Sequence, residues 1–245
     1  MSKTATFTFS ENLTVFLPKE QRKHMPVFYS FFGKPTVKDA IEAQGVPHVE
    51  VAYITVNGQA VDFSFWLEKD VEVQVYAKAP AGATALIPPA PVPLAFVLDV
   101  HLGKLARLLR LLGFDAFYLN LHDDPEIIEK AVAENRIVLT RDVHLLKYGK
   151  LKHGYWLRSQ QPEAQLKEVV ERYNLLPQLK PFTRCMVCNH LLHPVPKEQV
   201  IHQLQPLTRR HFNEFYQCSH CGKVYWKGSH YENMQRFLSN FQESD

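Results

Sequence analysis

The chain has 245 residues, of which 46% are hydrophobic and 22% are charged, so it is neither a disordered chain nor a single small domain. Its formal net charge of +3 is a mild basic bias, which suits a nucleic-acid partner but does not establish one. No uncharged apolar stretch approaches the roughly 18 residues of a membrane span, and the charged N-terminus lacks the apolar core of a secretory signal. We therefore expect a soluble, cytoplasmic protein with no membrane segment.

The first eighty residues predict a small mixed α+β sheet. Residues 4–9 alternate polar and apolar side chains, as a strand does. Thr36 is the expected N-cap of a helix that ends before Gly45. Asn57-Gly58 is a strong turn signal and predicts a hairpin, and a closing strand is expected over residues 71–75.

This order of elements resembles the ubiquitin-like β-grasp fold of the thiamine and molybdopterin sulfur carriers. The motifs that carry the resemblance are Thr-Val-Lys-Asp-Ala-Ile-Glu, Val-Asn-Gly-Gln-Ala-Val-Asp and Glu-Val-Gln-Val-Tyr. Sulfur-carrier chemistry needs a free C-terminal Gly-Gly, whereas this chain continues through Tyr76-Ala77-Lys78 without a glycine pair. The resemblance therefore implies a β-grasp domain over residues 1–79 that binds a protein partner or positions a substrate, rather than a sulfur carrier.

A proline-rich segment separates this domain from the rest of the chain. Residues 79–93 contain five prolines and no charged side chain, so they can form neither a helix nor a central strand. We assign residues 80–93 as a linker and expect the β-grasp domain to fold independently of residues 94–245.

Residues 94–179 predict an α/β domain. The pattern is strand–helix–strand–helix–strand, which requires parallel strands with right-handed crossovers and flanking helices. Asp124 is the expected N-cap of the second helix, with Pro125 at its first position. The expected strands are 94–100, 114–119 and 136–140. The expected helices are 102–112 and one that begins at Pro125 and buries Ile127, Ile128, Ala131 and Val132.

Acidic residues come after the strands of this predicted sheet. Asp99 ends the first strand, Asp142 lies just past the third, and Asp123 and Asp124 stand where the second strand leads into the second helix. Because the carboxyl ends of parallel strands meet at one edge, these side chains should lie together, and like charges there call for a cation. Oxygen-only ligands favour Mg²⁺ or Mn²⁺, which suggests metal-dependent hydrolysis of phosphodiester bonds.

Simpler roles exist for two of these acids. Asp124 could serve only as an N-cap, and Asp142 could cap a short helix through Leu145. Asp99 is harder to explain structurally, because an acid after a run of apolar residues in a central strand gains nothing from burial.

Several segments of residues 94–237 resemble the Mut-seven C-terminal RNase domain family. They are Phe-Val-Leu-Asp ending at Asp99, Leu-Gly-Lys-Leu-Ala-Arg-Leu-Leu-Arg from Leu102, Leu-Gly-Phe-Asp ending at Asp115, Asp123-Asp124, and Arg-Ile-Val-Leu-Thr-Arg-Asp ending at Asp142. The resemblance implies a PIN-like nuclease fold over residues 94–179, followed by a zinc ribbon, with Asp99, Asp124 and Asp142 as metal-binding catalytic carboxylates. Asp123 or Asp115 could supply a fourth acid.

Basic side chains near these acids are candidates for binding substrate. Lys104, Arg107 and Arg110 recur every three residues of the first helix, as on an ordinary solvated face. Lys104 and Arg107, about one and two turns after Asp99, could equally well hold phosphate. Arg141, between Thr140 and Asp142, is a third candidate.

Residues 180–245 contain all four cysteines of the chain. Cys185 and Cys188 form one Cys-x-x-Cys pair, and Cys218 and Cys221 form another after 29 residues. Two such pairs predict a zinc ribbon in which four thiolates fill the tetrahedral shell of a structural Zn²⁺. Nearby basic and aromatic side chains could grip single-stranded RNA, or the aromatic residues could simply form the core of the ribbon.

Two function classes therefore remain open. The first is a ribonuclease that uses Mg²⁺ or Mn²⁺. The second is a non-catalytic module, built on the same fold and a structural zinc ribbon, that recognises RNA or ribosomal particles without cutting. The presence of all three aspartates favours the enzyme, and cleavage of single-stranded RNA in Mn²⁺ and in EDTA separates the two.

Overall fold

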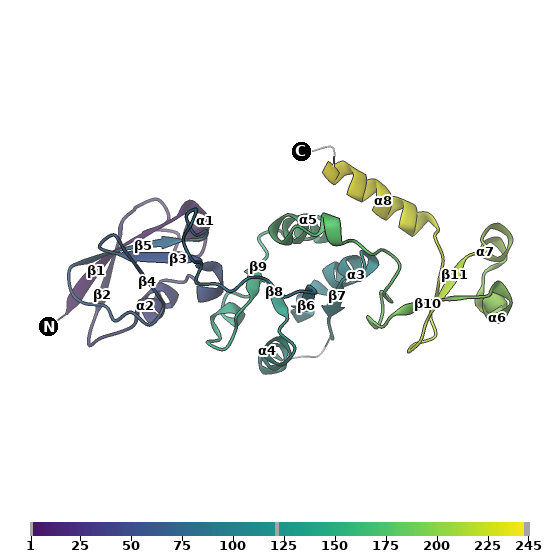
Figure 1. Ribbon diagram of the computed structural model, residues 1–245, viewed down its shortest axis with the longest axis horizontal. Coiled ribbons are helices and arrows are strands. Elements are labelled where there is room, and N and C mark those ends of the chain that lie inside the picture. The colour runs from purple at the N-terminus through teal and green to yellow at the C-terminus, as the bar shows by residue number, and fades with distance from the viewer. Residues whose placement is uncertain (1, 121–122, 243–245) are drawn as a thin grey trace. The chain divides into compact units, whose positions relative to one another are not determined.

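The structure is a computed structural model that describes residues 2–120 and 123–242, and it divides into two compact units (Figure 1). The first unit comprises the chain up to Leu105 together with Ala116–Leu175, and the second comprises Ala106–Asp115 and the chain from Leu176 onward. Residues 1, 121–122 and 243–245, which fall within the predicted domains, lie outside the described residues.

A five-stranded mixed sheet with the strand order β2-β1-β5-β3-β4 opens the first unit. Strand β1 pairs antiparallel with β2 and parallel with β5, as a β-grasp sheet requires. The side chains of Thr36 and Asp39 form a capping box at the start of α2, which fixes the beginning of that helix. The elements are β1 (Lys3–Phe9), α1 (Glu11–Thr14), β2 (Val27–Phe31), α2 (Val37–Ala43), β3 (Tyr53–Val56), β4 (Gln59–Val61) and β5 (Val71–Tyr76). The predicted α+β sheet is thus present.

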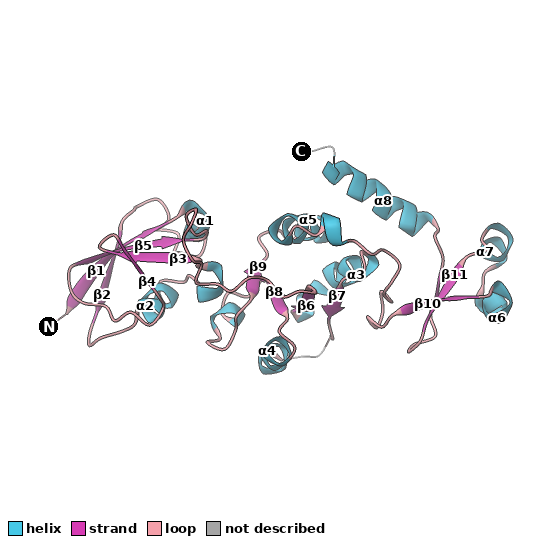
Figure 2. Ribbon diagram, in the orientation of Figure 1, coloured by secondary structure: helices cyan, strands magenta, loops and turns pink. Residues whose placement is uncertain are grey.

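A four-stranded sheet with the order β7-β6-β8-β9 forms the rest of the first unit. Strands β6, β8 and β9 run parallel, and Figure 2 shows α4 and α5 on opposite sides of them. Neighbouring residues of β6 serve the two faces, because the ring of Phe96 packs against Tyr173 of α5 while Val97 joins the cluster on the α4 side. The elements are β6 (Ala95–Leu98), β7 (Asp115–Phe117), α4 (Asp124–Ala133), β8 (Ile137–Thr140), β9 (Gly154–Trp156) and α5 (Pro162–Tyr173), with α3 (Gly103–Leu111) spanning the two units.

A short segment of the β-grasp sequence is built into this parallel-sheet fold. Val49 belongs to the same buried cluster as Val97 and Val138. The Glu50 carboxylate accepts a 2.9 Å hydrogen bond from the backbone N–H of Trp156 in β9. The ammonium group of Lys147 donates to the carbonyl oxygen of Glu42. These contacts argue against the independent folding expected from the proline-rich linker, and truncation of the chain tests it.

Helix α4 differs from its predicted form in two respects. Asp123, not Asp124, is its N-cap, and its carboxylate accepts a 3.1 Å hydrogen bond from the backbone N–H of Glu126. Val132, predicted to be buried with Ile128, is 45% exposed. The helix buries Ile127, Ile128 and Ala131, while Val132 lines a surface hollow with Tyr148.

The second unit holds a three-stranded antiparallel sheet in the order β10-β11-β12. Two short helices fill the long spacing between its cysteine pairs. Gly113, which ends α3 with φ +95°, packs so closely on the backbone of Lys180 that a Cβ atom would lie 2.0 Å from that carbonyl oxygen. The elements are β10 (Leu192–Val195), α6 (Lys197–Val200), α7 (Pro206–His211), β11 (Phe215–Cys218), β12 (Val224–Tyr225) and α8 (Ser229–Gln242). Among the described helices, none has the length and apolar character needed to cross a bilayer.

Candidate active site and cysteine cluster

Asp99 and Asp142 lie at the same edge of the parallel sheet. Strands β6 and β8 pair in parallel with Leu98 opposite Leu139, so the residues just after each strand emerge side by side. Between them stands Thr140, which is fully buried. Its hydroxyl donates a 2.7 Å hydrogen bond to Asp99 Oδ2 and accepts a 2.8 Å hydrogen bond from the backbone N–H of Asp142. One hydroxyl group therefore links the two aspartates.

The carboxylate of Asp99 is held at both oxygens. Besides the bond from Thr140, its Oδ1 accepts a 3.3 Å hydrogen bond from the backbone N–H of His101, because Asp99 caps the short 3₁₀ helix Val100–Leu102. Asp99 is 8% exposed, so its carboxylate is buried and held in one orientation at this edge of the sheet. The capping role means that Asp99 also has a structural use, which the strand pattern alone did not reveal.

Asp124 stands in the first turn of α4, beside the cap residue Asp123. Because Asp123 satisfies the N-terminal N–H group, the Asp124 carboxylate is not needed for capping. Partial burial raises the pKa of the Asp124 carboxyl group, and the negative charges of Asp142 and Asp99 raise it further, together with that of Asp123. Asp124 therefore lies in the same field of negative charge as the two strand-end acids.

Asp142 has one oxygen turned to the backbone, since its Oδ1 accepts a 2.8 Å hydrogen bond from the N–H of His144. Among the described residues, the only group of three or more metal-ligating side chains whose ligand atoms lie close enough to share one ion is the four cysteines. The aspartates are thus neighbours whose oxygens do not yet surround a common point, as expected of carboxylates that repel one another.

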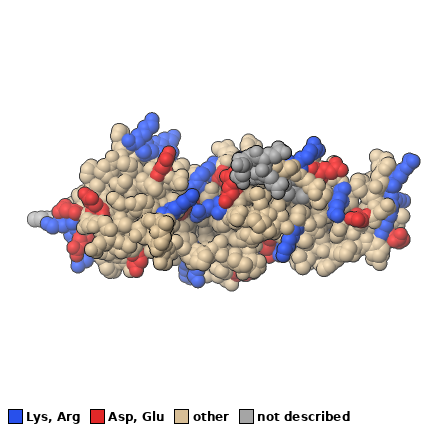
Figure 3. All heavy atoms as spheres, turned by 45° about the horizontal axis from the view of Figure 1, so that its top comes forward, with Lys and Arg blue, Asp and Glu red and all other residues tan. Residues whose placement is uncertain are grey.

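The predicted substrate-binding cations occupy different surroundings. Lys104 is exposed in the first turn of α3, and Arg107 is exposed further along it. The Arg141 guanidinium instead donates to the carbonyl oxygens of Leu157, Arg158 and Ser159 at 2.6–2.9 Å, so it ties the segment after β9 to the sheet. Lys and Arg alternate with Asp and Glu on the face drawn in Figure 3, without one continuous basic patch.

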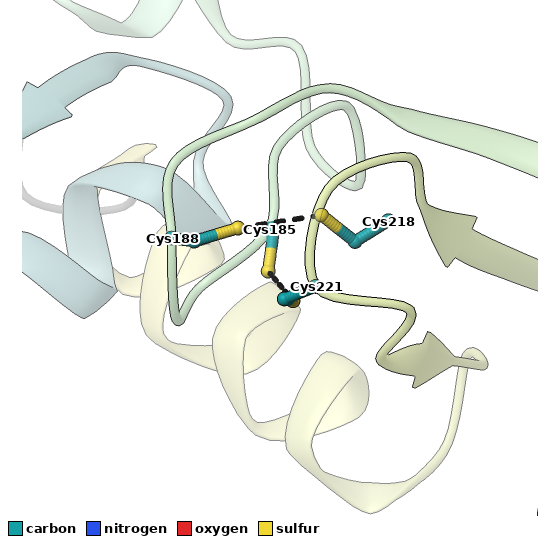
Figure 4. Close-up of side chains that lie close together, drawn as sticks. All are labelled: Cys185, Cys188, Cys218 and Cys221. Atoms are coloured by element: carbon teal, nitrogen blue, oxygen red, sulfur yellow. Dashed lines mark hydrogen bonds between the residues drawn. The ribbon is translucent and has the colours of Figure 1, made fainter.

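Four cysteine sulfurs converge in the second unit (Figure 4). Their Sγ atoms all lie within 4.8 Å of one another, with 3.3 Å between Cys188 and Cys218 and 3.6 Å between Cys185 and Cys221. Sulfurs about 2.3 Å from a shared Zn²⁺ are about 3.8 Å apart in a tetrahedron, so this arrangement could bind zinc. Burial opposes ionisation of Cys185, but hydrogen bonds from Tyr225 and from the backbone lower its pKa to about 6.

Arg110 supports this cluster from α3. It is 3% exposed and donates to the carbonyl oxygens of Met186 and Val187, within the first cysteine pair. Burial lowers the pKa of its guanidinium, while the Cys185 and Cys188 thiolates raise it. Asp115, a possible fourth acid from the sequence, pairs with Arg184 at 3.3 Å and accepts from Asn189 at 2.8 Å. Both residues therefore attach the cysteine loop within the second unit.

Thr140 is the site residue that sequence reasoning missed. The available signal was its position, since it is the one polar residue at the end of an otherwise apolar strand and stands two residues before Asp142. A hydroxyl group there has to find a partner, because burial without one costs about 1–3 kcal/mol. The partner, Asp99, is 41 residues away in the chain and becomes visible only in the folded sheet.

Comparison with known proteins agrees with this architecture. The family model for the Mut7-C RNAse domain matches residues 94–238, and that for the Mut7-C ubiquitin domain matches residues 2–81. No curated protein and no solved structure matches the chain. The ubiquitin-like match covers the five-stranded sheet, and the RNAse match covers the parallel sheet, the aspartate edge and the cysteine cluster. The chain belongs to the Mut7-C RNAse domain family, with a Mut7-C ubiquitin domain in front of the nuclease-type domain.

Proposed function

We propose that this chain is a metal-dependent ribonuclease that hydrolyses RNA phosphodiester bonds, with Asp99, Asp124 and Asp142 as the catalytic carboxylates. The observation that carries the proposal is the shared edge of the parallel sheet, where Thr140 links Asp99 to Asp142 and both acids raise the pKa of Asp124. The edge belongs to a Mut7-C RNAse domain, which favours nuclease chemistry over an unrelated use of the same acids.

The donor set fits a hard divalent cation. All the donors at this edge are carboxylate oxygens, which suit Mg²⁺ or Mn²⁺ rather than zinc. The raised pKa of Asp124 is the expected mark of acids that need a positive charge among them. When bound, such a cation supplies a water of lowered pKa and neutralises charge on the phosphodiester.

The three proposed catalytic aspartates have different surroundings, which give them different roles. Asp99 is oriented by the Thr140 hydroxyl and by the N–H of His101, so it is a rigid ligand. Oδ1 of Asp142 accepts a hydrogen bond from the backbone N–H of His144, which leaves Oδ2 for a metal ion. Asp124 projects from α4, while Asp123 holds the start of that helix as its cap.

Lys104 is the cation that we propose for the substrate in this region, because it is exposed and stands only a few residues after the Asp99 cap. Nη1 of Arg141 donates to three backbone carbonyl oxygens, and we give this residue a positioning role instead.

For the cysteine cluster we propose one structural zinc ion. Four thiolates would fill a tetrahedral shell and leave no open position for substrate, so the ion would hold the second unit together rather than react. Four free thiols close to one another suit a reducing compartment, and we propose a cytoplasmic location on that ground.

RNA, single-stranded where it enters the site, is the partner that this function requires. A protein partner for the ubiquitin-like domain stays a prediction. The exposed side chains of Phe28, Phe32 and Trp66 are where such a partner would be sought.

The test is cleavage of a labelled single-stranded RNA with Mn²⁺, with Mg²⁺ and with EDTA. Wild type should cut the RNA with either cation and not in EDTA, and Asp99→Asn should not cut in any buffer. Asp70→Asn is the matched control, since Asp70 is an exposed turn residue of the ubiquitin-like domain whose φ of +56° suits asparagine. RNA binding without cleavage by the wild-type protein in every buffer would favour the non-catalytic binding module instead.

A further inference from the structure

A polar cavity of about 440 Å³ lies inside the first unit, where the ubiquitin-like domain meets the parallel-sheet fold. Asn12 and Lys78 line it from the ubiquitin-like side. Tyr155, Arg158 and Arg172 line it from β9 and α5. Neither domain forms the cavity alone, so its shape depends on the contacts between Glu50 and Trp156 described above.

The carboxylates that line this cavity already have partners. Glu168 accepts hydrogen bonds from the backbone N–H groups of Arg158 at 2.8 Å and Ser159 at 2.7 Å. Glu50 accepts from Trp156, and Glu171 lies 3.7 Å from the ammonium group of Lys167. Each carboxylate of the cavity wall therefore already has a hydrogen-bond or ion-pair partner within the protein.

The cations of the same wall form no short ion pair with these carboxylates, although Arg158 donates a 2.8 Å hydrogen bond to the carbonyl oxygen of Trp156. Within the part of the chain that the structure describes, neither Lys78 nor Arg172 forms an ion pair with a carboxylate. Arg158 approaches Glu50 only at 3.9 Å. The guanidinium groups of Arg158 and Arg172 both lie over the ring of Tyr155, at 5.0 and 5.8 Å from its centroid, which holds them in place. The cavity thus presents oriented N–H donors to an anionic ligand.

One wall of the cavity, at Arg158, reaches the catalytic edge of the sheet. Strand β9 pairs in parallel with β8, with Trp156 opposite Thr140, so Arg158 comes after its strand at the same edge as Asp142 comes after β8. Backbone contacts join the two segments, because Leu157 donates to the carbonyl oxygen of Thr140. Adjacent strands are about 4.8 Å apart, and β9 is two strands from β6, so the distance along the edge from Asp99 is about 10 Å.

We propose that this cavity binds a phosphate of the RNA strand near, but not adjacent to, the one that is cut, with Lys78 and Arg172 as the contacting cations. The proposal rests on the ribonuclease function for its substrate. A strand bound at the aspartates and continuing past β9 reaches the cavity, whose volume accommodates a nucleotide. The ubiquitin-like domain then contributes Lys78 directly to substrate binding, which gives the domain a role in the nuclease itself.

Binding of RNA without cleavage tests the proposal. The full chain carrying Asp99→Asn is titrated, in EDTA, into a fluorescein-labelled single-stranded RNA, and anisotropy is followed at several salt concentrations. Adding Lys78→Ala and Arg172→Ala should raise the Kd at least about ten-fold and lower the salt slope by about 1.4, or about 0.7 for each phosphate contact. Lys152→Ala is the matched control, because Lys152 is exposed before β9, at the opposite end of the same strand.

Charge-keeping variants separate binding from folding. Lys78→Arg with Arg172→Lys should restore most of the affinity, because both keep a cation in the cavity, and thermal melts should match among all variants. A double alanine variant that binds RNA as tightly as Lys152→Ala would overturn the proposal. Adenosine monophosphate that binds through Lys78 and Arg172 while RNA affinity stays unchanged would also overturn it, since the ligand would then be a free nucleotide. Because the readout needs no cleavage, an absence of nuclease activity would refute the proposed function without deciding this one.

Discussion

Replacing Thr140 with valine tests the link between the two strand-end aspartates. Valine keeps the branched shape of threonine but removes the hydroxyl group that donates to Asp99 and accepts from the Asp142 N–H group. The first bond ends on a carboxylate, and such bonds contribute about 1.5–3 kcal/mol. The second loss leaves a partly buried N–H group without its acceptor, at a cost of about 1–3 kcal/mol.

Because the two bonds share one hydroxyl group, we expect a combined loss of about 3 kcal/mol in the free energy of unfolding. For a unit of this size, 1 kcal/mol corresponds to about 2–4 °C, so the melting temperature should fall by about 6–12 °C. Thr140→Ser keeps the hydroxyl group and removes one buried methyl group, which costs about 1 kcal/mol, or about 2–4 °C.

The assay is a thermal melt monitored by circular dichroism, in EDTA, for wild type, Thr140→Val and Thr140→Ser. Single-turnover cleavage of RNA in Mn²⁺ is measured beside it. We expect Thr140→Val to lower the cleavage rate without changing RNA affinity, and Thr140→Ser to keep most of the rate. Equal melting temperatures and equal rates for the valine and serine variants would refute the idea that this hydroxyl orients the site.

Three further predictions concern the cysteine cluster, the junction between the domains and the buried Glu50. Metal analysis should give about one zinc per chain, and Cys185→Ser should loosen the second unit in limited proteolysis; a variant lacking all four cysteines that retains zinc would contradict this. A protein that starts at Pro91 should be less stable and aggregate, because it exposes the surface that Val49 and Glu50 cover, and a truncated chain that melts as the full chain does would show the reverse. Burial raises the pKa of the Glu50 carboxyl group above its ordinary 4.5. The native state therefore binds the carboxyl proton more tightly than the unfolded state does, and the free energy of unfolding should fall as the pH rises from about 4.5 through the raised pKa. Glu50→Gln should remove that fall, and chemical denaturation of both proteins between about pH 4 and pH 7 measures it; parallel stability curves would contradict the buried charge.

Local patterns predicted the elements well, because capping and periodicity act over a few residues. The Thr36 cap, the Asn57-Gly58 hairpin and the strand before Asp99 all have local causes. The alternation of strands and helices also predicted the parallel order of strands, which brings Asp99 and Asp142 to one edge.

The features that the sequence did not show depend on contacts between distant residues. Arg110 has a helical spacing from Arg107 typical of a solvated face, yet it is buried against the carbonyl groups of Met186 and Val187. Glu50 gives no local sign that its carboxylate will meet the backbone of Trp156, 106 residues later.

The sequence could not decide between Asp123 and Asp124 as the N-cap, because aspartate is a favoured cap at either position. The cap lies one residue earlier than predicted, so the Asp124 carboxylate rather than that of Asp123 is available to bind a metal ion. Because Asp123 is the cap, Asp124 is the stronger candidate for the metal. The same shift leaves proline at the second position of the helix, which it tolerates.

The rate of RNA cleavage as a function of Mn²⁺ concentration, measured for wild type and Asp124→Asn, tests the central claim most directly. Asp123 caps α4, so the Asp124 carboxylate is not needed as the helix cap. We predict a saturable Mn²⁺ dependence for wild type and a rate at least about 100-fold lower for Asp124→Asn at every Mn²⁺ concentration, with an unchanged fold. Superimposable curves for the two proteins would contradict a catalytic metal site at this edge of the sheet.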